Sequence, residues 1–388
     1  MKKIENLNSC TACTACYSAC PTNCIKMIAH SDGFLYPQID KEKCISCNKC
    51  ERVCPELDPD KRPVFENAWY GWTKNEQVRK LSSSGGFFTE LANDVLNQDG
   101  VVYGTVFDYK TRNAVYISTK EATLEDMRKS KYVQSELKDT ISNIKQDLDM
   151  GKKVLFVGSA CHVAGVKKIL KNHKNYNKLI LCDFICHGVP SPKILREHLN
   201  YIENKKGKKI KSIDFRPKNH KIKPWSNYSL KIEFEDNEIL NTNRRTDWYM
   251  QSFLKQNTIL RKCCFDCKYS NQQHLADITV ADFWGINKYK PELNDQKGIS
   301  LIIANTEKGQ SIVTTLKEQF NLFQLEWTYA KYIYKSHNYY NINKRNKFFK
   351  LYNEQGYQKS MKKCVQTGIY MEIMKSSLRK IKTIIKIR

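Results

Sequence analysis

Short apolar runs separated by polar turns recur through the middle of the chain, and they predict a body of alternating strands and helices. Apolar runs bounded by turn residues are typical of strands, whereas apolar residues spaced three or four apart are typical of helices. Strands are expected at residues 68–72, 101–107, 114–117, 153–158, 179–186, 210–216, 228–234, 238–241, 278–281 and 299–305. Helices are expected at 87–96, 163–170 and 307–319. This alternation predicts a mixed α/β body.

The end of the chain has a different pattern. Residues 326–388 are polar, rich in Tyr and Lys, and expected to be helical. Apolar residues recur there at helical spacing between basic ones, at Tyr370, Ile373, Met374, Leu378, Ile381 and Ile385. Such a basic amphipathic helix would pack on the body, fray as a tail, or lie on an anionic membrane.

Eight of the nine cysteines in the first 54 residues form one motif that is written twice, 34 residues apart. Each copy reads C-x2-C-x2-C-x3-C-P, which is the ligand pattern of a bacterial two-cluster ferredoxin. In that pattern the fourth cysteine of each copy binds the cluster of the other copy. The spacing therefore predicts two 4Fe-4S clusters, one on Cys10, Cys13, Cys16 and Cys54 and one on Cys20, Cys44, Cys47 and Cys50. The alternatives, a disulfide framework or two zinc sites, do not fit this double spacing.

Seven further cysteines lie beyond residue 54, and some have ligand-like positions. Cys264-x2-Cys267 has metal-ligand spacing, and Cys161 and Cys186 each stand at the end of a predicted strand. Cofactors gather at such strand ends in α/β sheets. The alternative for each of these residues is a buried structural cysteine.

The formal net charge of +25 is concentrated at the end of the chain, where residues 331–388 hold fifteen Lys and Arg against two Asp and Glu. A basic chain raises the question of nucleic-acid binding, but no recognisable motif accompanies the charge, so no nucleic-acid partner is expected.

No apolar segment has the length of a signal or membrane-spanning segment. Sixteen cysteines without such a signal favour a reducing compartment. The expected location is cytoplasmic, with peripheral contact at the inner membrane face through the tail.

A set of motifs in the body resembles a known family. They are G-S-A-C-H-V-A-G at 158–165, D-F-I-C-H-G-V-P-S-P at 183–192, Arg261-x2-Cys264-x2-Cys267, and A-D-I-T-V-A-D-F-W-G-I at 276–286. With residues 82–86 and 131–135, they resemble the coenzyme F-420 hydrogenase/dehydrogenase beta-subunit family, in the bacterial branch that carries an N-terminal dicluster ferredoxin domain. The family usually has G-T-P-C-Q at the first motif and G-D-F-W-G at the last. Cys263, beside Cys264, leaves two thiols for one ligand position.

Members of that family are iron–sulfur flavoproteins that bind FAD. The resemblance implies a third 4Fe-4S cluster, held by Cys161, Cys186, Cys264 and Cys267. It also implies three domains: a 4Fe-4S dicluster ferredoxin domain (1–60), a beta-subunit N-terminal-like domain (61–150) and a C-terminal-like domain (151–325). The basic helical tail (326–388) lies outside the resemblance. The expected fold is thus α+β and multidomain, with a ferredoxin-type module, a mixed α/β flavoprotein body and a helical tail.

Two segments are expected to contact FAD. The first is Ser83, Ser84, Gly85 and Gly86, which precede a predicted helix. Hydroxyl donors, glycines that permit close approach and a helix N-terminus suit a pyrophosphate; the alternative is an ordinary capped turn. The second segment is Asp282, Phe283, Trp284 and Gly285. Its alternative is a pair of core aromatic residues behind a turn.

The expected function is electron transfer from the 4Fe-4S clusters through FAD to an unidentified two-electron acceptor, since clusters pass single electrons and a flavin delivers pairs. The expected donor is a ferredoxin or another redox protein. The acceptor would be a small organic substrate, with polysaccharide biosynthesis as one setting.

Lys131, Tyr132 and His187 are candidate general acids; His162 is either a pH-sensitive group near a cofactor or a satisfied hydrogen-bonding residue. The alternative function is a non-catalytic electron-transfer subunit that feeds a partner enzyme.

Overall fold

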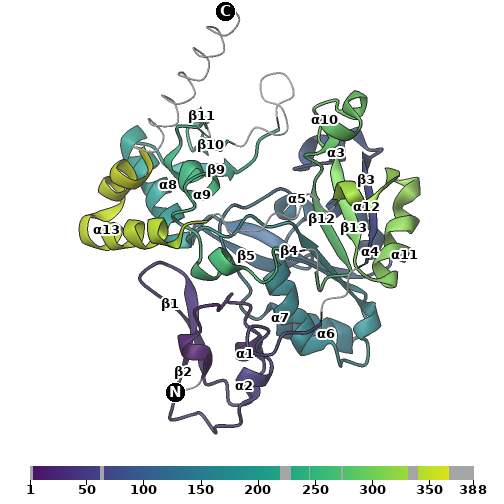
Figure 1. Ribbon diagram of the computed structural model, residues 1–388, viewed down its shortest axis with the longest axis horizontal. Helices are drawn as coiled ribbons and strands as arrows, with labels where there is room; N and C mark the ends of the chain where they lie inside the picture. Colours follow the sequence, from purple (N-terminus) through teal and green to yellow (C-terminus); the bar gives the residue numbers. More distant parts are fainter. Residues whose placement is uncertain are drawn as a thin grey trace, which may run out of the picture.

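The computed structural model of the 388-residue chain describes residues 3–61, 65–218, 229–243, 245–271, 274–330 and 340–366. These residues form a small cysteine-rich module, a large mixed sheet with helices on both faces, and a second layer of helices with a small sheet (Figure 1). This arrangement confirms the expected α+β architecture, with a ferredoxin-type module first and a helical segment last.

The cysteine-rich module contains only short elements. They are η1 (Lys3–Asn6), α1 (Ala15–Ser18), β1 (Ile25–Ala29), β2 (Leu35–Ile39) and α2 (Lys49–Arg52). β1 and β2 pair as an antiparallel hairpin between the two cysteine motifs. The module has little apolar core of its own, because Ile4, Ile25 and Ile39 are packed mainly against cysteine side chains.

The large sheet has nine strands in the order β14-β3-β13-β12-β8-β7-β4-β5-β6. Their bounds are β3 (Asn67–Thr73), β4 (Val101–Asp108), β5 (Asn113–Ser118), β6 (Ser135–Glu136), β7 (Val154–Val157), β8 (Leu179–Phe184), β12 (Ile278–Asp282), β13 (Ser300–Ala304) and β14 (Phe320–Leu325). The four central strands, β12, β8, β7 and β4, run parallel. Parallel strands are buried on both faces, which explains why these segments were continuous apolar runs in the sequence.

Helices cover both faces of this sheet. α4 (Phe87–Leu96) and α11 (Glu307–Thr315) pack on one face, where Leu91 and Val313 are fully buried. α6 (Thr140–Asp149) and α7 (Ala160–Leu170) pack on the other face through Ile144 and Val166. The remaining short elements around the sheet are α3 (Glu76–Leu81), α5 (Leu124–Met127), η2 (Tyr176–Lys178), α10 (Ile286–Tyr289), η4 (Pro291–Leu293), η5 (Leu316–Glu318) and α12 (Trp327–Ala330).

The second layer is built from helices around a three-stranded sheet with the order β11-β10-β9. Its elements are α8 (Pro192–Lys206), β9 (Ile210–Asp214), β10 (Lys231–Phe234), β11 (Ile239–Asn241), α9 (Trp248–Leu254), η3 (Lys262–Asp266), α13 (Ile342–Met361) and η8 (Lys362–Gln366). Leu195, Tyr249 and Phe348 share one buried core there. The described part of the predicted tail therefore packs on the body. The amphipathic helix predicted around residues 370–385 lies outside the described residues.

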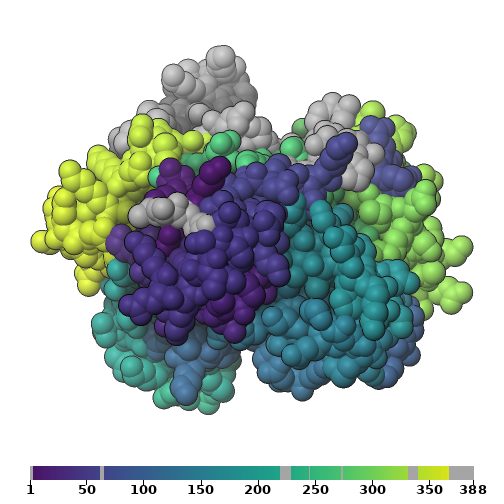
Figure 2. Space-filling view, turned by 90° about the horizontal axis from the view of Figure 1, so that it is seen from below, coloured from purple at the N-terminus to yellow at the C-terminus, as the bar shows by residue number. Residues whose placement is uncertain are grey.

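The module lies against the body beside the helices α6 and α7 (Figures 1 and 2). Lys168 of α7 donates to Asp58 (2.7 Å), and Lys171 forms an ion pair with Asp60 (2.6 Å). From α13, Arg345 forms an ion pair with Asp32 in the turn between β1 and β2 (2.6 Å). Over the described ranges, no helix combines the length and the apolar character that a membrane crossing requires.

Candidate functional site

The two cysteine motifs share one backbone conformation. Ala12 and Thr14 have left-handed φ angles of 58° and 56°, and Ser46 and Asn48, which occupy the same motif positions, have 57° and 59°. Loops that alternate between right- and left-handed residues turn their N–H groups into a concavity that suits anions and iron–sulfur clusters. The repeat seen in the sequence is thus also a repeat in three dimensions.

The first cysteine set brings together the residues that the crossover pattern predicts. Burial raises the pKa of Cys13 to about 12, and the nearby charges of Cys10 and Cys54 add to the shift. Burial also raises the pKa of Cys16, again with contributions from Cys13, Cys10 and Cys54. Cys54, from the second motif, is therefore close to three cysteines of the first.

The second set is less enclosed. Cys20, Cys44 and Cys50 pack around the small apolar cluster of the module, whereas Cys47 is exposed. Cys24, the ninth cysteine, is buried with its Sγ atom 3.3 Å from that of Cys20. The first set consequently faces the body, and one side of the second set faces solvent.

A third group of cysteines lines a narrow cavity of about 40 Å³ in the body. Cys161 lies in the first turn of α7, Cys186 follows β8, and the others lie on and just after η3; the lining cysteines are Cys161, Cys186, Cys263, Cys264 and Cys267. Segments more than a hundred residues apart in the sequence therefore meet at one place.

The donor set of this cavity fits a cubane cluster. Cys186 Sγ accepts a hydrogen bond from the N–H of Gly188 (3.2 Å), and Cys161 Sγ lies 3.3 Å from the hydroxyl of Ser159; donors of this kind tune sulfur ligands. Burial raises the pKa of Cys186 to about 11 and that of Cys267 to about 12, so iron binding would release their protons. No group of three or more His, Cys, Asp or Glu in the described ranges is arranged to hold a single metal ion.

Two adjacent thiols compete for the fourth ligand position of this cavity. Cys264 is 7% exposed and packs in the apolar core beside Leu260. Cys263 interacts electrostatically with Cys161, Cys186 and Cys267, and it raises the pKa of each, after burial in every case. The C-x2-C spacing thus favours Cys264 as the fourth ligand, whereas the electrostatic interactions with the other three cysteines favour Cys263.

Three adjacent parallel strands lead to the candidate cofactor residues. Cys161 follows β7, Cys186 follows β8, and Asp282 ends β12. In the parallel pair of β8 and β12, Phe184 is aligned with Val280, so Cys186 and Asp282 each lie two residues further along. Both residues are therefore at the carboxyl edge of the sheet, where α/β proteins bind ligands.

The two segments predicted to hold FAD meet at this side of the sheet. The Ser84 hydroxyl donates to the carbonyl of Ile299 (2.8 Å), and the same carbonyl accepts the N–H of Phe283 (2.9 Å). The Ser83 hydroxyl accepts the N–H of Ser130 (3.1 Å). A third segment, around Ser130, therefore joins the two that the sequence indicated.

The structure adds two cations that the sequence interpretation missed. Arg216 Nη1 pairs with Asp282 (2.8 Å), and its guanidinium lies 5.5 Å from the centre of the Trp284 ring. Lys218 Nζ donates to the Ser84 carbonyl (2.8 Å), and burial, aided by the charge of Arg79, lowers its pKa to about 7. The sequence did contain a signal for these two cations: Arg216 and Lys218 flank a proline at the end of the strand predicted at 210–216.

The eight predicted FAD-binding residues have unequal surroundings. Phe283 is 2% exposed and packs 5.5 Å from Tyr70, so it lies in the core, whereas Trp284 is 42% exposed. A Cβ on Gly85 would lie 2.4 Å from the Gly71 carbonyl, so Gly85 allows the loop to pack closely on β3. Gly86 has a φ of 94°, a conformation that glycine adopts readily. Gly285 lies against the Phe283 ring.

Two of the candidate general acids, Lys131 and Tyr132, follow Ser130, which contacts the candidate flavin segment at Ser83. Lys131 Nζ donates to the carbonyls of Asp126 (2.6 Å) and Arg128 (2.7 Å), and burial lowers its pKa to about 7. Burial raises the pKa of Tyr132 to about 12, with the Arg216 charge opposing the shift. At neutral pH, Lys131 can thus gain or lose a proton, whereas Tyr132 stays protonated.

The two candidate histidines, His187 and His162, form hydrogen bonds outside the candidate flavin segments. His187 is held between Asn257 (3.0 Å) and Tyr340 (3.1 Å). His162 Nδ1 lies 3.2 Å from the Tyr116 hydroxyl, and burial lowers its pKa to about 4. His162 is therefore a neutral, hydrogen-bonded residue at physiological pH.

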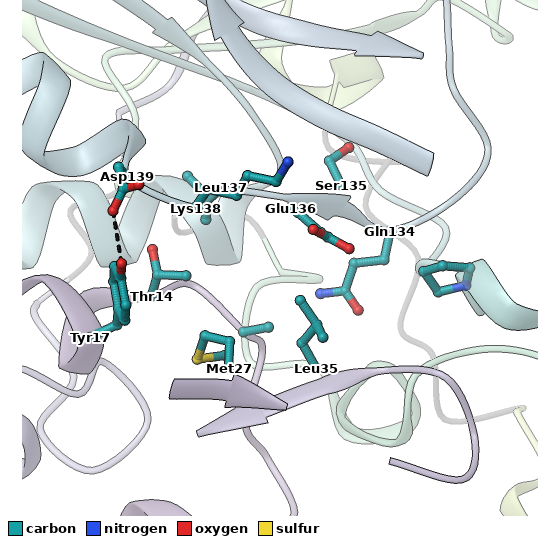
Figure 3. A pocket seen from close by; sticks show the side chains of 12 residues that line it. Thr14, Tyr17, Met27, Leu35, Gln134, Ser135, Glu136, Leu137, Lys138 and Asp139 are labelled. Carbon is teal, nitrogen blue, oxygen red and sulfur yellow. Dashed lines mark hydrogen bonds between the residues drawn. The ribbon is translucent and has the colours of Figure 1, made fainter. Parts of the chain in front are cut away.

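A larger cavity, of about 260 Å³, lies between the module and the body but has no cysteine in its lining (Figure 3). Tyr17 of the module donates to Asp139 across it (2.8 Å). Met27, Leu35 and Leu137 provide apolar walls. This cavity is separate from the candidate flavin segments.

Comparisons with known proteins identify the module and the body. Residues 9–56 match a 4Fe-4S dicluster domain. Residues 68–142 and 151–325 match the N-terminal and C-terminal parts of the coenzyme F-420 hydrogenase/dehydrogenase beta subunit, and together these two matches cover more than half of the chain. The chain belongs to this family. It is an iron–sulfur electron-transfer protein related to a hydrogenase beta subunit.

Other comparisons are more distant. No curated protein matches the chain. Among solved structures, a chain of the F-420-reducing nickel–iron hydrogenase complex from Methanosarcina barkeri, studied by xenon derivatization, is similar with 16% identity and a TM-score of 0.47. The match covers 72% of this chain and 92% of the other.

Proposed function

We propose that this beta-subunit relative is an FAD-dependent oxidoreductase that passes electrons from its 4Fe-4S clusters to a small organic acceptor. The observation that carries the proposal is the shared strand edge: Cys186 and Asp282 extend from the aligned ends of neighbouring parallel strands. A flavin held at Asp282 and Trp284 would therefore lie beside the third cysteine group. FAD, when bound, takes electrons singly and gives them up in pairs.

Residues of the chain would hold each group. The third cluster would be bound by Cys161, Cys186, Cys267 and one thiol of the adjacent pair, Cys264 by spacing. The Arg216 guanidinium beside Asp282 and the Lys218 side chain beside Ser84 would supply positive charge, and phosphate oxygens favour such donors. Trp284, exposed and beside Arg216, offers a flat surface for a ring.

Aromatic packing joins the two sites. His187, next to Cys186, lies 5.2 Å from the Phe253 ring, which in turn lies 5.3 Å from the Tyr132 ring. Phe253, which is buried, thus lies between the residue after Cys186 and the ring of Tyr132. Lys131, with a pKa of about 7, is the group that we assign to supply a proton to the reduced acceptor.

The test is anaerobic purification with iron, sulfide and flavin measured per chain. About twelve irons, three cubanes' worth, with one FAD would support the proposal, and a screen of organic acceptors, beginning with polysaccharide precursors, would follow. About eight irons and no flavin would refute it.

The second candidate function is a non-catalytic subunit that feeds a partner enzyme, as the beta-subunit relationship favours. The two functions differ in one assay. Reoxidation of the reduced protein by a small acceptor alone supports the oxidoreductase, whereas reoxidation that requires a partner protein supports the subunit. In either case the external donor would be a ferredoxin or a similar protein, and the protein would act in the cytoplasm.

A further inference from the structure

Arg261 is a buried cation at the boundary between the module and the body. It is 1% exposed, precedes η3, and its backbone N–H donates to the carbonyl of Val189 (2.9 Å). Its side chain leaves the body and reaches into the module. It therefore lies between the first cysteine set and the third.

Each of the three guanidinium nitrogens has a hydrogen-bond acceptor. Nε donates to the Cys10 carbonyl (2.7 Å), and Nη2 donates to the Leu35 carbonyl (2.8 Å) and lies 3.7 Å from Cys10 Sγ. Nη1 donates to the side chain of Gln134 (2.9 Å), which itself donates to the Thr11 carbonyl. The Tyr36 ring covers the guanidinium, with its centre 4.3 Å away.

Arg261 differs from the other buried arginines in having no carboxylate partner. Arg79, Arg216 and Arg345 each form an ion pair with an Asp, at 2.7, 2.8 and 2.6 Å. No such pair involves Arg261 in the part of the chain that the structure describes. A buried charge is costly unless it is paired, so the countercharge must come from other groups.

The groups that can supply this charge are sulfur ligands. Cys10 belongs to the first set, and Cys263 and Cys264 belong to the third; all three act electrostatically on Arg261. We propose that Arg261 is the shared counter-cation of the first and third clusters, and that it raises the reduction potential of the cluster bound by Cys10. For the third cluster, this inference rests on the proposed function.

The direction of the effect follows from charge. Reduction adds one negative charge to a cluster, and a fixed cation or an N–H donor near its sulfurs stabilises that state. Electrons that enter through the exposed second set would therefore collect at the cluster of Cys10, next to the body. Arg261 would act as a positioning and tuning residue for electron transfer without touching the acceptor.

The test is a redox titration of the full-length protein, reconstituted anaerobically and followed by electron paramagnetic resonance. Arg261→Gln removes the charge, Arg261→Lys keeps it, and Lys262→Gln removes an exposed charge on the next residue as a matched control. We expect Arg261→Gln to shift the reduction equilibrium of the Cys10 cluster at least tenfold toward the oxidised form, about 59 mV for one electron. The Lys variant and the control should shift it less than threefold.

Two results would overturn the proposal. One is an Arg261→Gln protein with a full iron content and an unchanged midpoint; the other is an Arg261→Lys protein that shifts tenfold or more. If the Gln variant fails to hold iron, the Lys variant alone decides, because retention of the charge should keep both the iron and the midpoint. The wild-type iron and flavin contents are measured in parallel, so the failure of the flavoprotein proposal would be seen separately.

Discussion

The contact between Gly165 and Cys13 gives a direct test of how the module sits on the body. Gly165 is buried in the middle of α7, and a Cβ there would lie 2.6 Å from Cys13 Cβ and 2.9 Å from both Cys13 O and Sγ. Neither the carbonyl nor the Cβ atom can rotate away. We therefore predict that Gly165→Ala pushes the first cysteine loop off the helix.

The magnitude follows from two opposing effects. Replacing Gly by Ala in a helix interior stabilises the helix by about 1 kcal/mol. Forcing a methyl group into a packed contact costs about 1–3 kcal/mol. The module should thus lose about 1–3 kcal/mol of docking stability, whereas the body should gain about 1 kcal/mol, because only the body receives the helix gain.

Two optical signals separate these effects. All six Trp residues lie outside residues 1–60, so tryptophan fluorescence in a urea titration follows the body. Visible absorbance of the ferredoxin clusters, measured in flavin-depleted Cys186→Ser protein to remove the cofactors proposed for the body, follows the module. We expect bleaching at lower urea in Gly165→Ala, and lower still in Gly165→Ser, with the fluorescence midpoint at or above its wild-type value. A Gly165→Ala protein that is stabilised in both signals would refute this docking geometry.

Three further predictions concern the other sites. Cys186→Ser should lower the iron content by about four per chain while the resonance signals of the ferredoxin clusters remain; loss of all iron would contradict separate sites. Arg216→Gln should weaken FAD binding about tenfold or more, since hydrogen bonds to charged groups contribute about 1.5–3 kcal/mol, whereas the exposed control Lys211→Gln on β9 should not; fluorescence titration measures both. Because the folded pKa of Lys131 is about 7 and lies below its unfolded value, the unfolded chain binds more protons above that pH. Urea unfolding should therefore show stability rising from pH 7 to pH 9, and Lys131→Met should reduce the slope.

The sequence was most informative where the ligand spacing is local or where strands are buried on both faces. The eight motif cysteines, the central strands β7, β8 and β12, and the strand ends that carry Cys161 and Cys186 all follow from short-range patterns. The family match and the mixed α/β body confirm the recognition and the fold. The assignments of the third cluster and of FAD remain predictions.

The roles of Arg216, Lys218 and Arg261 could not be predicted, because each depends on contacts between distant segments. Arg261 was visible only as part of a motif, yet its partners Cys10 and Leu35 lie more than 220 residues away. β14 was missed because a half-exposed strand alternates weakly. α8 was missed although its sequence carried a signal, since Ile194, Leu195, Leu199 and Ile202 have helical spacing after the N-cap Ser191. The structure places the ring of Phe283 in the core, which was the alternative for that segment, and the contact of residues 282–285 with FAD stays a prediction.

The body buries one of the two cysteine-motif loops and leaves the other exposed to solvent, and this difference should determine how the protein responds to air. Both loops have the same fold, but Cys13 lies under α7, whereas Cys47 is exposed and the neighbouring Ile45 is 65% exposed. Molecular oxygen would reach the loop of Cys47 directly and the loop of Cys13 only after the module separates from the body. Inactivation in air should therefore have two stages, and the fast stage should belong to the more exposed cluster, the one expected on the loop of Cys47.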